Sequence, residues 1–158
     1  MIIYFADRNM NILGQASTEL PTGICIKNDK RTEELENGSK VLEFDLYYTD
    51  DTREKVEKWA DVGNYILRQV GEEQEFYTII ESELSVYNQR IYVYAEDEGM
   101  DLLNETVGAY TADKAYSAKY YIEKFSYDSG FEVGLNEIID LNRKLSWEEE
   151  STASARLL

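Results

Sequence analysis

Residues 63–94 constrain the fold more than any other part of the chain, because they contain three consecutive segments with the pattern of β-strands. The segments are 64–70, 75–84 and 87–95. They are rich in Ile, Val, Tyr and Phe, which are residue types that favour strands. Gly71 marks the first turn, and the second turn falls near 85–89. Segments spaced this closely predict an antiparallel β-meander.

The segment from Lys40 to Tyr48 has the clearest alternation of apolar and polar residues. Successive side chains of a strand point to opposite faces, so a period of two predicts one packed face and one face in water. On this basis we expect Leu42, Phe44 and Leu46 to be buried, and Glu43 and Asp45 to be exposed.

The remaining elements of residues 1–95 are shorter. We expect strands at 2–6, 11–14 and 24–27, turns at 20–23 and 37–38, and a helix at about 52–60 capped by Asp50 or Asp51. Residues 1–95 are therefore predicted to form a mostly antiparallel, β-barrel-like domain.

The character of the chain changes after Ala95, and residues 96–158 are expected to begin a second, mixed α/β unit. Its central element is a predicted helix at 114–128, capped by Asp113 and ended by Gly130. Helical spacing predicts that Ile122 and Phe125 are buried.

Short strands are expected at 131–133 and 143–147, followed by a helix that enters at Ser151 or Thr152 and is cut off at Leu158. The predicted fold class is therefore α+β and β-rich, with a second unit that is expected to be truncated.

The net charge of −16 comes from 32 acidic and 16 basic residues. Binding to nucleic-acid phosphates needs Lys and Arg to displace counterions, so this charge argues against nucleic-acid binding. It also argues against anionic membranes. The acidity indicates either a solubility device or a wall past which DNA slides without binding.

The sequence predicts no catalytic, cofactor-binding or metal-binding residues. It contains no histidine and one cysteine, which excludes a Ser-His-Asp triad, a Cys-His site and a cysteine metal cluster. It has no Gly-rich phosphate loop, and the start of a calcium loop at Asp140 and Asn142 is not completed. Glu81 and Glu83 share one strand face as a carboxylate pair, which we interpret as the solvent side of the meander.

Aromatic residues leave a further alternative open. The tyrosine group is Tyr116, Tyr120, Tyr121 and Tyr127. Without a basic groove, these residues are interpreted as core and interface rather than as a base-stacking platform. Exposed coplanar aromatics, including Trp59 or Trp147, would instead indicate a carbohydrate-binding module.

Several segments resemble the N-terminal region of phage minor structural proteins, which are Tal-like, tail-associated baseplate hub proteins. The segments are FADRNMNILG at 5–14, ELENGSKVLEFDL at 34–46, GNYILR at 63–68, EFYTIIESE at 75–83, VYAEDEGMDLLNE at 93–105 and ADKAYSAKYYIEKFSYDSGFEVG at 112–134. The resemblance spans nearly the whole chain and consists of structural signatures, without a catalytic motif.

The resemblance implies a homotrimeric hub of paired β-barrel-like domains at the tail tip of a long-tailed phage or prophage. Such a ring continues the tail tube and docks on the distal tail protein, near other tail-tip and tape-measure components. It implies a location at the virion tail tip, with assembly in the cytoplasm of the bacterial host, and no enzymatic activity. The alternatives are a carboxylate-based hydrolase of cell walls or polysaccharides, and a carbohydrate-binding module.

Overall fold

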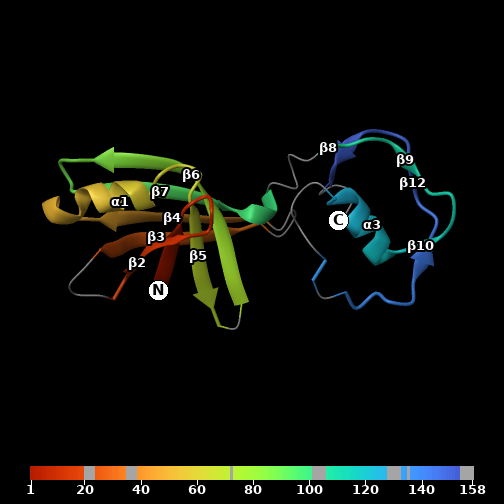
Figure 1. Cartoon of the computed structure of the whole chain (residues 1–158), viewed down its shortest axis with the longest axis horizontal. Helices are drawn as coiled ribbons and strands as arrows, with labels where there is room; N and C mark the ends of the chain where they lie inside the picture. Colours follow the sequence, from red (N-terminus) through yellow and green to blue (C-terminus); the bar gives the residue numbers. More distant parts are fainter. Residues whose placement is uncertain are drawn as a thin grey trace. The chain divides into compact units, whose positions relative to one another are not determined.

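The computed structural model describes residues 1–19, 24–34, 39–71, 73–100, 106–127, 133–134 and 136–153. The chain divides into two compact units, 1–98 and 99–158 (Figure 1). The predicted turns at 20–23 and 37–38, and Gly130, lie outside the described residues.

Within the described residues, the first unit contains seven strands and one α-helix. With the 3-10 turn η1, the elements in chain order are β1 (Ile2–Ala6), β2 (Ile12–Ser17), β3 (Cys25–Glu33), β4 (Lys40–Tyr47), η1 (Asp50–Thr52), α1 (Arg53–Trp59), β5 (Tyr65–Val70), β6 (Glu73–Ser85) and β7 (Arg90–Asp97). A second 3-10 turn, η2 (Glu98–Met100), spans the boundary between the two units in the sequence. The β-rich α+β fold class predicted from the sequence is confirmed.

The seven strands form one mixed sheet in the order β1-β2-β3-β4-β7-β6-β5, and β5 pairs back onto β1. All neighbouring strands are antiparallel except β2 and β3, which are parallel and joined by the single pair Ser17–Cys25. The sheet therefore closes on itself and has an inner and an outer face.

Apolar side chains fill the inner face. Its core includes Ile3, Phe5, Ile26, Leu42, Phe44, Leu46, Ile66, Tyr77, Ile79, Ile91 and Val93, each at most 1% exposed. Burial of these side chains is the main favourable contribution to folding of this unit. The predicted burial of Leu42, Phe44 and Leu46 is confirmed.

Asp45 is buried rather than exposed, and Glu43 is half-buried. Arg90 forms an ion pair with Asp45, and Asn28 donates a hydrogen bond of 2.6 Å to the other carboxylate oxygen. Asn28 adopts φ 55° within the bulge of β3 between Lys27 and Lys30. The alternation identified the outer strand face correctly, but neighbouring side chains cover Asp45 there.

A bulge at Ile80 changes the direction of the side chains along β6. Ile79 pairs with Ala95, whereas Glu81 pairs with the next residue, Tyr94, so Ile80 is the extra residue. Before the bulge, Glu75, Tyr77 and Ile79 are buried, whereas Ile80 is 47% exposed.

Helix α1 packs through Val56 and Trp59, which are both buried. The Trp59 ring stacks on Phe5, with 5.6 Å between ring centroids, and it also lies against Gly14. The expected cap is wrong: Asp50 and Asp51 lie inside η1, and the Thr49 N–H donates to the Thr52 hydroxyl over 2.9 Å.

The second unit is built from short strand pairs and one described α-helix (Figure 1). Its elements are β8 (Thr106–Val107), β9 (Tyr110–Thr111), β10 (Tyr116–Ser117), α3 (Ala118–Phe125), β11 (Asn142–Arg143), β12 (Ser146–Trp147) and β13 (Ser151–Thr152). The pairs are β10 with β11, β12 with β9, and β13 with β8.

Helix α3 is shorter than the predicted helix at 114–128. Tyr116 and Ser117 pair with β11 instead, and Ser117 rather than Asp113 caps the helix by accepting from the Tyr120 N–H. Asp113 accepts a hydrogen bond from the Tyr116 hydroxyl over 2.7 Å.

The buried stripe of α3 contains Tyr121 and Phe125, so the prediction for Phe125 is confirmed. Ile122 is half-buried, and the prediction that it is buried is wrong. The Tyr121 hydroxyl donates to the Arg143 carbonyl over 2.8 Å and accepts from the Leu145 N–H over 3.2 Å. This side chain attaches the segment between β11 and β12 to the helix.

One further expectation for this unit is wrong. The predicted strand at 143–147 is divided between β11 and β12, because the two pieces pair with different strands. Ser151 and Thr152 pair with β8 as a strand, and Ala153, directly after Thr152, is helical, in agreement with the predicted helix entry; residues 154–158 lie outside the described residues.

We predict that Gly14→Ala destabilises the first unit, although alanine generally suits a strand interior better than glycine. An added Cβ would lie 1.9 Å from a Trp59 ring carbon. The free energy of unfolding, measured by urea denaturation, should fall by about 1–3 kcal/mol. Gly108→Ala, whose Cβ would meet no atom within 4 Å, is a control in the second unit and should leave unfolding of the first unit unchanged. Equal stability of G14A and wild type would show that the tryptophan ring moves aside without cost.

We predict that Phe125→Ala lowers the free energy of unfolding of the second unit by about 3–5 kcal/mol, because it leaves a cavity in an aromatic core. Fluorescence of Trp147, whose ring centroid lies 4.9 Å from that of Phe125, can report this transition. Tyr127→Ala, at a side chain that is 84% exposed, should change it by less than about 0.5 kcal/mol. A similarly small loss in F125A would mean that this face is not core.

Candidate interaction surfaces

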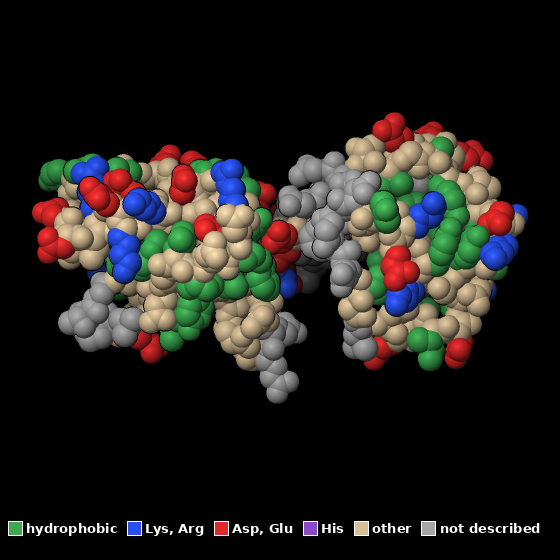
Figure 2. All heavy atoms as spheres, viewed as in Figure 1, with side chains coloured by type: hydrophobic (Ala, Val, Ile, Leu, Met, Phe, Trp, Pro, Cys, Tyr) green, Lys and Arg blue, Asp and Glu red, His purple; other side chains and the backbone are tan. Residues whose placement is uncertain are grey.

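The outer face of the first unit has an apolar side, formed mainly by β1, β2 and β5. Tyr4 pairs with Leu67, which pairs with Phe76, so these three side chains form one row across β1, β5 and β6. Ile2 and Ile12 are 53% and 57% exposed. Figure 2 shows hydrophobic side chains gathered on one face of this unit.

Charge is nearly absent from these three strands. Their sequences, IIYFA, ILGQAS and YILRQV, contain no Asp or Glu and one Arg, whereas the whole chain has 32 acidic residues. Contiguous exposed apolar surface of this kind is typical of protein interaction sites.

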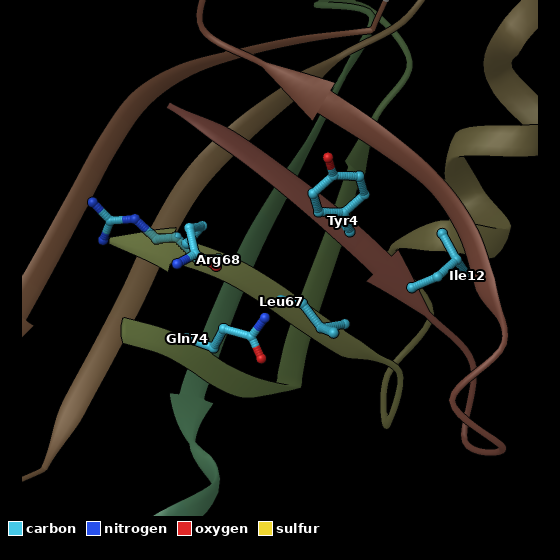
Figure 3. Close-up of a pocket in the computed structure, with 6 residues that line it drawn as sticks. Tyr4, Ile12, Leu67, Arg68 and Gln74 are labelled. Atoms are coloured by element: carbon cyan, nitrogen blue, oxygen red, sulfur yellow. The ribbon is translucent and has the colours of Figure 1, made fainter. Parts of the chain in front are cut away.

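A pocket of about 270 Å³ is hollowed into this apolar side. Figure 3 shows Tyr4, Ile12 and Leu67 around it, with Gln74 nearby and the guanidinium group of Arg68 directed away from Tyr4. The walls are therefore mainly apolar and uncharged, which suits an apolar side chain of a protein partner better than a charged metabolite.

The opposite side of the outer face, formed by β4 and β7, is rich in acidic residues and tyrosine, and it is called the acidic side below. The register produces two rows: Lys30–Glu43–Tyr94–Glu81 and Lys27–Asp45–Tyr92–Glu83. Glu81 and Glu83 are both exposed, in agreement with our interpretation of them as the solvent side of the meander.

Hydrogen bonds connect the tyrosines to the carboxylates of this acidic side. The Tyr92 hydroxyl donates to Glu43 over 2.9 Å, and Lys30 reaches the other oxygen of Glu43 at the same distance. Hydrogen bonds from Lys30 and Tyr92 lower the pKa of Glu43. Burial, followed by the hydrogen bond to Glu43, raises the pKa of Tyr92 to about 12.

A charge cluster lies at one end of the inner face, and sequence reasoning missed it. Glu75 is 5% exposed and accepts hydrogen bonds from Arg31 over 2.8 Å, from Tyr77 over 2.9 Å and from Arg68 over 3.4 Å. The Lys40 ammonium lies 3.9 Å away. Glu75 follows the alternation of β6, but its cationic partners come from three other strands, so no local sequence signal identifies them.

The tyrosine group predicted from the sequence is divided between core and surface. Tyr121 is buried, Tyr127 is exposed, and Tyr116 stacks on Tyr120 with 3.8 Å between ring centroids. Hydrogen bonding between Tyr110 and Tyr120 raises the pKa of Tyr110 to about 12. The predicted core role is confirmed for Tyr121, whereas the interface role of the exposed tyrosines stays a prediction.

Neither tryptophan that the sequence suggested for a carbohydrate site is exposed. Trp59 is buried, whereas Trp147 is half-buried among Tyr110, Tyr121 and Phe125. Within the described part of the chain, no group of three acidic or cysteine side chains is placed to hold a metal ion. No described helix is both long and apolar enough to cross a bilayer.

A comparison of the chain with protein-family models and with curated proteins finds no match.

We predict a pH dependence of stability that depends on Tyr92. A tyrosine whose pKa is raised on folding contributes stability that is complete below its unfolded pKa, about 10, and is lost as pH rises to about 12. Tyr92→Phe should therefore make the decline in stability between these pH values shallower in urea titrations. Tyr87→Phe, at a side chain that is 97% exposed, serves as the control. Identical declines in Y92F and wild type would contradict the assignment.

Proposed function

We propose that this chain is a structural component of a phage tail tip. In this role it forms part of a homotrimeric baseplate hub, which continues the tail tube and docks on the distal tail protein during host attachment and DNA ejection. Tape-measure and other tail-tip components are its expected neighbours. The protein is assembled in the cytoplasm of the bacterial host.

The observation that supports this proposal is the two-sided outer face of the first unit. An apolar side of β1, β2 and β5 lies across the closed sheet from an acidic side of β4 and β7. An assembly protein needs apolar surface for its neighbours. A channel for DNA benefits from carboxylates, which repel phosphates and prevent binding.

In this proposal the apolar side contacts the subunit or protein that adjoins it in the tail. The row of Tyr4, Leu67 and Phe76 supplies large side chains, and the neighbouring pocket receives an apolar side chain of the partner. The acidic side, which carries Glu81 and Glu83, faces the path of the DNA.

We further propose that the chain works without catalysis. The two buried carboxylates of the described residues, Asp45 and Glu75, are each held by cationic side chains. Burial raises the pKa of Glu75, but hydrogen bonds from Tyr77 and Arg31 outweigh it and lower the pKa overall. A general acid needs the opposite shift. Release of fragments from purified cell walls, abolished by E81Q or E83Q, would contradict this.

The experiment that tests the proposed function uses phage particles assembled in cells that produce the tagged chain in place of the native copy. We expect the tag at the tail tip by immunogold labelling, and density for three copies around the tail axis by cryo-electron microscopy. Absence of the chain from particles, or a position away from the tail axis, would overturn the proposal.

The same particles test the apolar side. The double change Tyr4→Asp and Leu67→Asp places charge in the apolar row and should reduce incorporation into particles at least about tenfold, because desolvating these carboxylates opposes docking. Val86→Asp is the matched control, since Val86 is an apolar residue that is 56% exposed outside this side. Far-ultraviolet circular dichroism checks that each variant is folded. Normal incorporation of the folded double variant would show that another surface docks.

A further inference from the structure

The closed sheet has a gap beside β3. The single residue pair between β2 and β3 joins the last residue of β2, Ser17, to the first residue of β3, Cys25. Because the two strands are parallel, β3 runs on beyond the point where β2 ends. From Ile26 to Glu33, β3 is paired with β4 on one side, and no described residue forms a ladder with its other side.

Apolar packing does little to hold this part of β3 in place. Every residue from Lys27 to Glu33 is exposed, and Ile26 is the buried residue of the strand. Segments with exposed side chains and few buried contacts open at a lower free energy than the core.

One ion pair crosses the inner face from β3 to the far side of the gap. Arg31 lies on β3 and Glu75 on β6, and these strands are not neighbours in the sheet. Their 2.8 Å contact therefore joins two strands that share no backbone hydrogen bonds. On β5, next to β6, Arg68 pairs in register with Glu75 and holds it from that side.

We propose that Glu75 is a charge latch that holds the exposed half of β3 across this gap. Loss of its charge, or of Arg31, frees the edge of β3 while the rest of the first unit stays folded. The residue that determines this local stability is thus on a different hairpin from the strand it restrains.

The charged and titratable groups around Glu75 come from several strands. They are Arg31 and Glu33 of β3, Lys40 of β4, Arg68 of β5 and Tyr77 of β6, while Asp97 of β7 is the register partner of Tyr77. The inward residues of β1 and β2 are apolar, among them Ile3 and Ala16. Among the ion pairs of the described residues, three cations (Arg31, Lys40 and Arg68) contact Glu75, so the cluster depends on the charge of this carboxylate.

The sign of the pH effect follows from the lowered pKa of Glu75. A carboxyl group whose pKa falls on folding contributes stability above its ordinary pKa, 4.5, and that stability is lost as pH falls through the folded value. The latch is therefore closed at neutral pH and opens in acid.

Hydrogen–deuterium exchange with mass spectrometry on the whole chain tests the latch. Arg31→Gln and Glu75→Gln should each raise exchange of the 26–33 peptide by about tenfold or more at neutral pH, with little change in the 90–97 peptide of β7. Arg31→Gln is the milder variant, since Glu75→Gln leaves several cations without their carboxylate. Arg53→Gln, which removes an exposed ion pair with Glu57 of 2.7 Å, is the matched control.

Exchange measured at acidic pH distinguishes local opening of β3 from destabilisation of the whole first unit. After correction for intrinsic exchange rates, exchange of the wild-type 26–33 peptide should move toward that of Glu75→Gln as the pH falls below 4.5. Unchanged exchange at 26–33 in both variants would overturn the proposal. So would an equal rise at 26–33 and 90–97, because the cluster would then support the whole unit rather than one edge. Neither result depends on the proposed tail-tip role.

Discussion

Pairing of β1 with both β2 and β5 is the contact on which the first unit depends. Tyr4 illustrates this: its neighbours are Gln15 on one side and Leu67 on the other. Because this pairing closes the sheet, each strand has one face toward the core and one toward the outside. The apolar side, the acidic side and the inward charge cluster all follow from that division.

The two sides of the outer face have different physical origins. The apolar side is a property of composition, since β1, β2 and β5 lack acidic residues. The acidic side is a property of register, which places Tyr92 and Tyr94 between carboxylates from both neighbouring strands. Its tyrosine hydroxyls hold the carboxylates in place, and exposed carboxylates such as Glu81 and Glu83 supply the negative surface.

Local sequence patterns predicted features that depend on the alternation or the helical spacing within one element. The burial of Leu42, Phe44 and Leu46 follows from alternation, and the burial of Phe125 follows from helical spacing. Asp45 is buried although alternation predicts that it is exposed, and no pattern predicted the buried ion pairs of Glu75. The partners of both carboxylates come from strands distant in sequence. Tyr116 and Ser117, near the start of the predicted helix at 114–128, pair with β11, a tertiary contact that overrides helix propensity. The candidate surfaces could not be predicted from the sequence either, because they depend on the pairing register between strands, which no pattern within one strand specifies.

The bulge at Ile80 has a consequence for how β6 tolerates change. Before it, Glu75, Tyr77 and Ile79 point inward; without it, the same alternation would carry Glu81 and Glu83 into the core. One additional residue therefore keeps two carboxylates in water while the strand remains continuous. β6 should accept many substitutions on its outer face, but deletion of this single residue would exchange the inside and the outside of its second half.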